Sequence, residues 1–185
     1  MTESPSRRKM LSVEQIDAAV AEVGDLAASA GARILLVGGV ALNHYGSDRF
    51  TADVDFVADQ PIAALPAESP LSFGGYQSHT SQGVAVDLIL RDDDFTAIYE
   101  EALLHPRRLA GVPVPVVSPE YLVLMKMVAR RPKDELDLET LLGLGVVDID
   151  KTRRMVRRLL GAYAVADLDS AVQMAAWRRE KPGHT

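Results

Sequence analysis

Hydrophobic residues recur every three or four positions near the start of the chain, and this spacing predicts an amphipathic helix. The residues with this helical spacing are Ile16, Val20, Val23 and Ala27. Ser12 and Gln15 have the spacing of a capping box, which places the start of the helix after Ser12. Gly31 is the kind of residue at which a helix ends, so the first helix is expected between these two points.

Short apolar runs separated by turn residues then indicate a sheet. Strands are expected at 33–37, 53–58, 76–80 and 83–90, with helices at 40–45 and 94–104, a loop at 60–73 and an extended pair at the sheet edge within 107–118. From Ser118 the spacing is helical, with further helices expected near 134–143, 150–162 and 168–180. The pattern predicts an α+β fold: a small mixed sheet with flanking helices over residues 12–117, followed by a helical region over 118–181.

Two aspartates interrupt the apolar strand at 53–58. Asp53 and Asp55 lie two residues apart, so in a strand both carboxylates point to one face while Val54 and Phe56 point to the other. Asp87 lies in a second apolar strand, where an unpaired charge is unfavourable. If the two strands are neighbours, the three carboxylates form an open site for a hard cation, Mg²⁺ or Mn²⁺.

A structural explanation of these aspartates stays open. An Asp-x-Asp pair is common in turns, caps and salt bridges, and Arg33 or Arg49 could neutralise Asp53 or Asp87 without any catalytic role. A single aspartate of this kind is therefore weak evidence of a site, whereas three in one place are stronger evidence.

Gly38 and Gly39 follow the first strand and precede a short helical stretch. This arrangement lets backbone N–H groups approach phosphate oxygens closely, although a tight strand-to-helix turn would also explain it. The sequence contains neither a G-x-G-x-x-G fingerprint nor a P-loop, which excludes these two phosphate-binding motifs.

Composition narrows the classes of protein that the chain could represent. It has 185 residues, 48% of them hydrophobic, and no cysteine, which excludes disulfides and thiolate chemistry. No apolar run approaches the ~20 residues of a membrane span, and the N-terminus lacks the apolar segment of a secretory signal, so a cytoplasmic protein is expected.

The net charge is −6, yet residues 126–185 hold 12 Lys/Arg against 9 Asp/Glu. A run of arginines at 153–158 is either a solvated face or a surface that contacts RNA.

The motifs together resemble a known family. Residues 38–56 read GGVALNHYGSDRFTADVDF, which is similar to the Gly-Gly (or Gly-Ser), helix and Asp-x-Asp pattern of the nucleotidyltransferase superfamily, with its polymerase-beta-like fold. With the later segment SPEYLVLMKMVARRPKDELDLETLL, the chain looks like the AbiEii/AbiGii toxin-type nucleotidyltransferases over about residues 33–142.

The resemblance implies roles for individual residues. Gly38 and Gly39 would hold the triphosphate, although Gly39 replaces the serine of Gly-Ser members. Asp53 and Asp55 would bind the metal, and Asp87 would be the third carboxylate, activating an acceptor hydroxyl. Further contacts to the nucleotide are implied for Arg49, Thr51, Lys126, Lys133 and Asp137. By its position on an apolar helix, Lys126 could equally be a lysine of the solvated surface.

The function that the resemblance implies is Mg²⁺-dependent transfer of an NMP from an NTP to an acceptor hydroxyl, with release of pyrophosphate. The acceptor would be tRNA or a protein, and a cognate antitoxin is a possible partner. One alternative is an antibiotic nucleotidyltransferase that modifies a small molecule such as an aminoglycoside. Another is a non-catalytic antitoxin or binding module.

Overall fold

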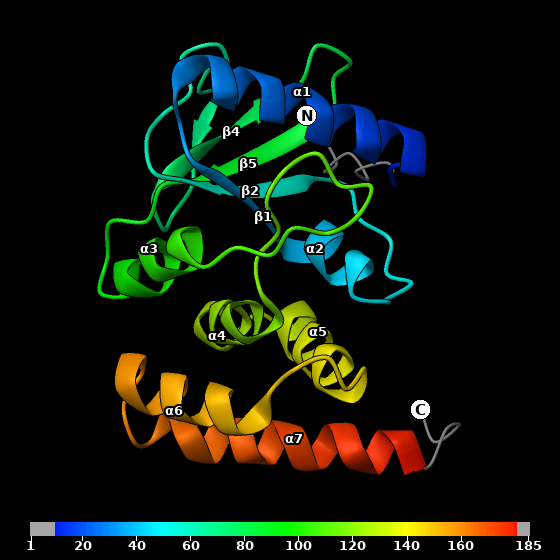
Figure 1. Ribbon diagram of the computed structural model, residues 1–185, viewed down its shortest axis with the longest axis vertical. Helices are drawn as coiled ribbons and strands as arrows, with labels where there is room; N and C mark the ends of the chain where they lie inside the picture. Colours follow the sequence, from blue (N-terminus) through cyan, green and yellow to red (C-terminus); the bar gives the residue numbers. More distant parts are fainter. Residues whose placement is uncertain (1–9, 181–185) are drawn as a thin grey trace, which may run out of the picture.

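A five-stranded mixed β-sheet forms one part of the molecule, as the computed structural model shows for the described residues 10–180 (Figure 1). The strands are β1 (Ile34–Val37), β2 (Val54–Ala58), β3 (Ser69–Pro70), β4 (Gly75–His79) and β5 (Ala85–Ile89). Their order in the sheet is β1-β2-β5-β4-β3. Only the β2–β5 pair is parallel, and the other neighbours are antiparallel. The predicted α+β fold with a small mixed sheet is therefore confirmed.

Seven helices complete the described part of the chain. They are α1 (Val13–Ala30), α2 (Gly38–His44), α3 (Thr96–Leu104), α4 (Pro119–Ala129), α5 (Pro132–Gly143), α6 (Ile149–Leu159) and α7 (Ala164–Glu180). The capping box of Ser12 and Gln15 is formed at the start of α1, and Gly31 ends the helix in the left-handed conformation. Residue 181, the last of the expected helical region, lies outside the described residues.

Two segments differ from the expectation. The expected loop at 60–73 contains the two-residue strand β3, which is tolerated at a sheet edge although it includes a proline. The extended pair expected within 107–118 is reduced to isolated bridges from Val116 to Arg107 and to Leu36. Pro113 and Pro115 have no N–H to donate, so a continuous ladder cannot form there.

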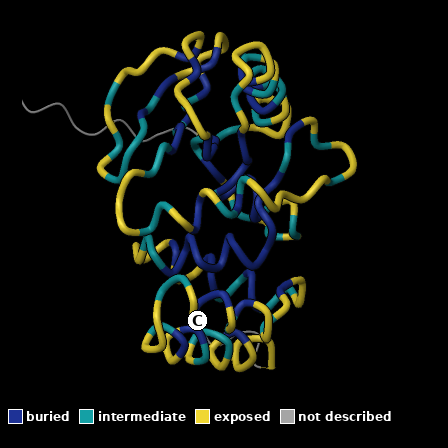
Figure 2. The backbone as a smooth tube through the Cα atoms, turned by 60° about the vertical axis from the view of Figure 1, so that its left-hand side comes forward, coloured by how far each residue is buried: buried dark blue, intermediate teal, exposed yellow. Residues whose placement is uncertain are grey.

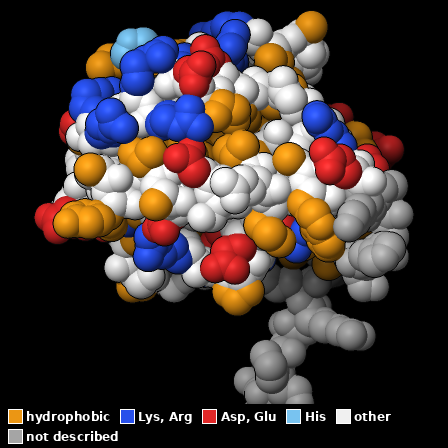
Figure 3. All heavy atoms as spheres, turned by 90° about the horizontal axis from the view of Figure 1, so that it is seen from below, with side chains coloured by type: hydrophobic (Ala, Val, Ile, Leu, Met, Phe, Trp, Pro, Cys, Tyr) orange, Lys and Arg blue, Asp and Glu red, His pale blue; other side chains and the backbone are white. Residues whose placement is uncertain are grey.

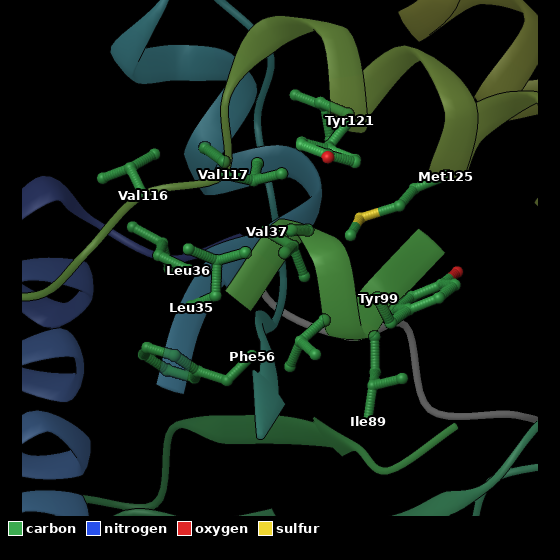
Figure 4. Close-up of a cluster of buried hydrophobic side chains, with 14 of the residues drawn as sticks. Leu35, Leu36, Val37, Phe56, Ile89, Tyr99, Val116, Val117, Tyr121 and Met125 are labelled. Atoms are coloured by element: carbon green, nitrogen blue, oxygen red, sulfur yellow. The ribbon is translucent and has the colours of Figure 1, made fainter. Parts of the chain in front are cut away.

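Helix α4 lies between the sheet and the last two helices, and its residues from Pro119 to Met127 are all buried (Figures 1 and 2). Figure 4 shows Met125 of α4 in one cluster with Val37 of β1, Ile89 of β5 and Tyr99 of α3. Side chains on α4 are thus held in place against the end of the sheet. Within residues 10–180, no helix is both long and apolar enough to cross a bilayer.

Figure 3 views the molecule from the side on which α6 and α7 lie, and basic and acidic side chains are interspersed on this face. Arg153 pairs with Asp150 and Asp169, and Arg158 pairs with Glu101 of α3. Part of this arginine run therefore joins α6 to α7 and to α3, in addition to facing solvent.

Candidate active site

The sheet register brings two of the three predicted aspartates side by side. Asp55 on β2 pairs with Asp87 on the parallel neighbour β5, and Gln77 of β4 lies opposite Asp87 on the other side. Gln77 Nε2 donates a hydrogen bond of 3.0 Å to Asp87 Oδ1. Val54 and Phe56 are fully buried on the opposite face, as the alternation predicts.

Thr51 orients the third aspartate. Its hydroxyl Oγ1 lies 2.9 Å from the backbone oxygen of Asp53 and 3.2 Å from the carboxylate oxygen Oδ1 of the same residue. Because Thr51 is almost wholly buried, it holds the turn that leads into β2. Asp53 is in this way positioned two residues before Asp55, in the bend that leads into β2, so the strand begins one residue later than expected.

Gly38 is required by the close approach of Asp55. It has a positive φ of 65°, and a Cβ added there would lie 1.9 Å from Asp55 Oδ2. Any side chain at this position would both strain the backbone and displace the carboxylate. At Gly39 an added Cβ would lie 3.3 Å from Thr51 Oγ1 and 3.4 Å from Arg49 Nη1, which small shifts of these side chains can accommodate.

We therefore expect Gly38→Ala to lower the free energy of unfolding by about 2–4 kcal/mol, because it adds backbone strain to a steric clash. Gly39→Ala is the matched control and should change the free energy by less than ~1 kcal/mol, since alanine also favours the helical conformation. Denaturant unfolding of both variants measures the difference. Equal effects at the two glycines would contradict this account of the Gly38–Asp55 contact.

Asp55 carries the strongest electrostatic signal of the site. Burial, together with the nearby carboxylates of Asp53 and Asp87, raises the pKa of Asp55 to about 6, although Lys126 and Lys133 lower it in part. Three carboxylates thus accumulate more negative charge than the neighbouring lysines offset. Such a shift in a cavity is typical of a functional site.

The two arginines that could have neutralised the aspartates structurally pair elsewhere. Arg33 Nε lies 2.8 Å from Asp59 Oδ2, and Arg49 forms an ion pair with Asp137 of α5. The latter pair joins the loop before β2 to the helical region.

Lys126 is buried, so it is not a lysine of the solvated surface. Its Nζ lies 2.9 Å from Asp134 Oδ1 and 2.6 Å from Asp137 Oδ2. Arg131 Nε completes the cluster at 2.6 Å from Asp134 Oδ2. Burial alone would raise the pKa of Asp134, but its bonds to Arg131 and Lys126 hold that pKa below the ordinary value.

A cavity of about 360 Å³ lies between the aspartates on the sheet and the basic residues of the helical region. Most of the predicted site residues line it: Gly38, Gly39, Arg49, Thr51, Asp53, Asp55, Asp87, Lys126 and Lys133. Asp137 does not line the cavity and instead lies behind it, bonded to Lys126 and Arg49. This position suits a residue that orients the side chains of Lys126 and Arg49 better than one that contacts a nucleotide.

Sequence reasoning missed several residues that line the same cavity: Phe73, Arg91, Tyr99, Arg131 and Asp134. A signal for Arg91 was available, because it follows Asp87 by four residues and an extended chain places both on one face. Asp134 caps the start of α5, because its carboxylate accepts a hydrogen bond from the Arg131 N–H. Because α5 begins at Pro132, earlier than expected, Asp134 also lies within reach of Lys126.

Among residues 10–180, no group of three histidine, cysteine, aspartate or glutamate side chains is arranged so that it could hold a metal ion. The donor chemistry nevertheless fits a hard cation, since all three candidate ligands are carboxylates and the pKa of Asp55 is raised by the other two. Closer approach of the three side chains would be needed to complete such a site.

Neither a protein-family model nor a curated protein matches the sequence. The solved structures that match this chain include two whose TM-scores lie just below 0.5. One is an antigenic nucleotidyltransferase-like protein from Paracoccidioides brasiliensis, at 19% identity and a TM-score of 0.48, covering 90% of this chain and 95% of that one. The other is the antibiotic-resistance factor ANT(2'')-Ia, at 13% identity and a TM-score of 0.47, covering 94% and 99%.

Proposed function

We propose that the protein is a nucleotidyltransferase that uses Mg²⁺ or Mn²⁺. The observation that carries this proposal is the register of Asp55 and Asp87 on neighbouring parallel strands, in a cavity that Lys126, Arg131 and Lys133 also line. Carboxylates that bind a divalent cation, facing side chains that bind phosphate, are what a metal–triphosphate complex requires. Nucleotidyl transfer is therefore the chemistry that fits these side chains best.

In the proposed reaction, the hydroxyl oxygen of an acceptor attacks the α-phosphorus of an NTP. The bond from the α-phosphorus to the bridging oxygen breaks, and pyrophosphate leaves. Asp53, Asp55 and Asp87 would hold the metal, which would neutralise charge on the triphosphate and the leaving group. Asp87 would also accept the proton of the attacking hydroxyl, with Gln77 fixing the orientation of its carboxylate.

The basic residues of the cavity would bind and orient the triphosphate. Lys133 and Arg131 come from the start of α5 and its N-cap, whereas Arg49 comes from the loop before β2. We accordingly assign catalysis to residues 12–117 and a contribution to nucleotide binding to the helical region 118–181. The Arg49–Asp137 ion pair would join the two regions, and Lys126 would hold Asp137 in place within the helical region.

Transfer of label from an α-labelled NTP tests the proposal directly. Purified protein and Mg²⁺ would be incubated with each NTP and, separately, with total tRNA, a cell protein extract and an aminoglycoside panel. We expect label on tRNA or protein, as in the toxin-type enzymes that the sequence resembles, and none with Asp55→Asn. Label on an aminoglycoside would instead support the antibiotic-modifying alternative. The AbiEii/AbiGii subfamily and a cognate antitoxin as partner belong to the same proposal and follow only if tRNA or protein is labelled.

A non-catalytic module is the alternative from another class. It would show no transfer with any acceptor and no binding of an Mg²⁺–NTP complex. Binding without transfer would keep the enzyme proposal and point to a missing acceptor, whereas loss of both would exclude it.

A further inference from the structure

Basic side chains gather in one part of the face seen in Figure 3, at its upper left. Helix α6 lies on this side of the molecule and carries Lys151, Arg154 and Arg158 at intervals of three and four residues. That spacing places the three side chains along one flank of the helix, over about 10 Å. All three are exposed, whereas Met155 and Val156 are buried against the rest of the protein. The flank is therefore open to a ligand.

The segment that follows α3 brings two further arginines beside this flank. Arg107 and Arg108 are both exposed. Burial raises the pKa of Tyr45 to about 12, Arg107 opposes this rise and Glu120 adds to it, so both charged groups lie near the Tyr45 hydroxyl. Lys151 Nζ in turn lies 3.5 Å from Glu120 Oε2. Tyr45 and Glu120 therefore connect this segment to the flank of α6.

The backbone of the same segment is held firmly in place. Arg107 exchanges two backbone hydrogen bonds with Val116, of 2.7 and 2.9 Å. The ring of His105 stacks on that of Tyr121, with 6.3 Å between the ring centres, and its Nδ1 lies 2.9 Å from the backbone oxygen of Glu101. Because the arginines project from a fixed segment and from a helix, a ligand does not have to order the backbone when it binds.

The acidic side chains nearby are already engaged in ion pairs: Glu101 with Arg158, Glu120 with Lys151 and Asp150 with Arg153. Within residues 10–180, Arg107, Arg108 and Arg154 form no ion pair. The whole chain has a net charge of −6, so positive charge that is not neutralised is concentrated here on an acidic protein. We call the basic surface the group made up of Arg107, Arg108, Lys151, Arg154 and Arg158.

The basic surface is separate from the candidate active site. None of its residues lines the active-site cavity. It meets α4 at Glu120, in the first turn of the helix, whereas Lys126 and Ala129 line the cavity near the other end of the same helix. A ligand of the basic surface is therefore recognised by contacts that the nucleotide does not make.

We propose that the basic surface binds the phosphate backbone of a structured RNA. Exposed arginines suit this ligand, because the planar guanidinium donates two parallel hydrogen bonds to one phosphate. A bilayer is less well suited, since the apolar side chains of α6 are buried and cannot insert into it. The choice of RNA among polyanions rests on the proposed function, because an RNA also supplies the terminal hydroxyl that transfer requires.

Two double variants test the basic surface. Arg107→Gln/Arg154→Gln removes two of its arginines, and Arg33→Gln/Arg179→Gln is the matched control. Each double variant removes two exposed arginines, so the net charge is the same in both, and none of the four residues lines the active-site cavity. The dissociation constant of unfractionated tRNA would be measured without NTP at several salt concentrations. A DNA duplex, polyglutamate and vesicles of anionic phospholipid would be measured in parallel.

We expect Arg107→Gln/Arg154→Gln to raise the dissociation constant of tRNA about tenfold. The slope of the logarithm of affinity against that of salt concentration should become shallower by about 2, because each lost phosphate contact removes about one released counterion. The control should change neither quantity. If label is transferred to tRNA, the KM for tRNA should rise by a similar factor in the first variant only, while the KM for NTP stays unchanged.

Equal affinities and slopes for the two double variants would overturn the proposal, and so would failure of the unmodified protein to bind tRNA. If the DNA duplex, polyglutamate or the vesicles bind at least as tightly as tRNA and depend on the same two arginines, RNA is the wrong partner and the proposal is also overturned. Failure of the proposed function has a different signature, namely no label transfer to any acceptor and no binding of an Mg²⁺–NTP complex. The tRNA measurements contain no NTP, so they still decide whether the basic surface binds RNA.

Discussion

Asp55→Asn is expected to abolish nucleotidyl transfer while making the metal-free protein more stable. Transfer should fall by about a thousandfold, since a neutral amide neither holds a divalent cation well nor shares the charge of the other two aspartates. The asparagine has the same shape, so it fits against Gly38 without a new clash. Label transfer and denaturant unfolding in a chelator measure the two effects separately.

The gain in stability should depend on pH in a defined direction. The pKa of Asp55 is raised to about 6 in the folded protein, above its unfolded value of 3.8, so the folded state binds the proton more tightly. The ionised carboxylate therefore destabilises the fold increasingly as the pH rises from about 4 to 6, and fully above that range. Screening by water in the cavity reduces the effect, and we expect Asp55→Asn to gain about 1–2 kcal/mol at pH 7 and almost nothing at pH 4.

Asp59→Asn is the matched control, at the residue that directly follows the other end of β2. Asp59 is paired with Arg33, and although its partial burial opposes ionisation, the hydrogen bonds and charge of Arg33 lower its pKa. Asp59→Asn should consequently lose a little stability at neutral pH and leave transfer unchanged. A loss of stability with Asp55→Asn would contradict the charge imbalance proposed for the three carboxylates.

Lys126→Met is expected to lower the free energy of unfolding strongly. The ammonium pairs with Asp134 and Asp137, which are at most 3% exposed, and methionine cannot satisfy either carboxylate. Arg131 and Arg49 remain as partners, so we expect a loss of about 3 kcal/mol in the free energy of unfolding. The same variant should also weaken the binding of Mg²⁺-bound triphosphate, because Lys126 lines the cavity.

Lys151→Met provides the comparison, because Lys151 is 47% exposed and its Nζ lies 3.5 Å from Glu120 Oε2. Its loss should change the free energy by less than about 1 kcal/mol. The pKa of Asp134 is lowered in the folded state, so the stability that its pairing contributes is present above pH ~4 and is lost as the pH falls below that value. The difference between Lys126→Met and the unmodified protein should therefore shrink in acid, and a constant difference would argue against the ion-pair explanation.

Local patterns determined much of the framework. The Ser12–Gln15 capping box and Gly31 define α1 because capping depends on residues within one turn of each other. The period of two places Asp55 on one face of β2, and Val54 and Phe56 on the other, whatever the strand pairs with. These features depend only on covalent geometry and short-range hydrogen bonds, so the sequence alone was enough to predict them.

Only the tertiary structure decided which distant residues meet. The parallel register of Asp55 with Asp87 depends on the whole path through β3 and β4, and no local pattern specifies it. The burial of Lys126 is a second example, since an apolar helix with one lysine fits both a surface and a core until Asp134 and Asp137 of the next helix are placed beside it. Contacts of this kind depend on how whole elements pack, because long-range pairing is selected by the burial of the complete core and not by the residues at the contact itself.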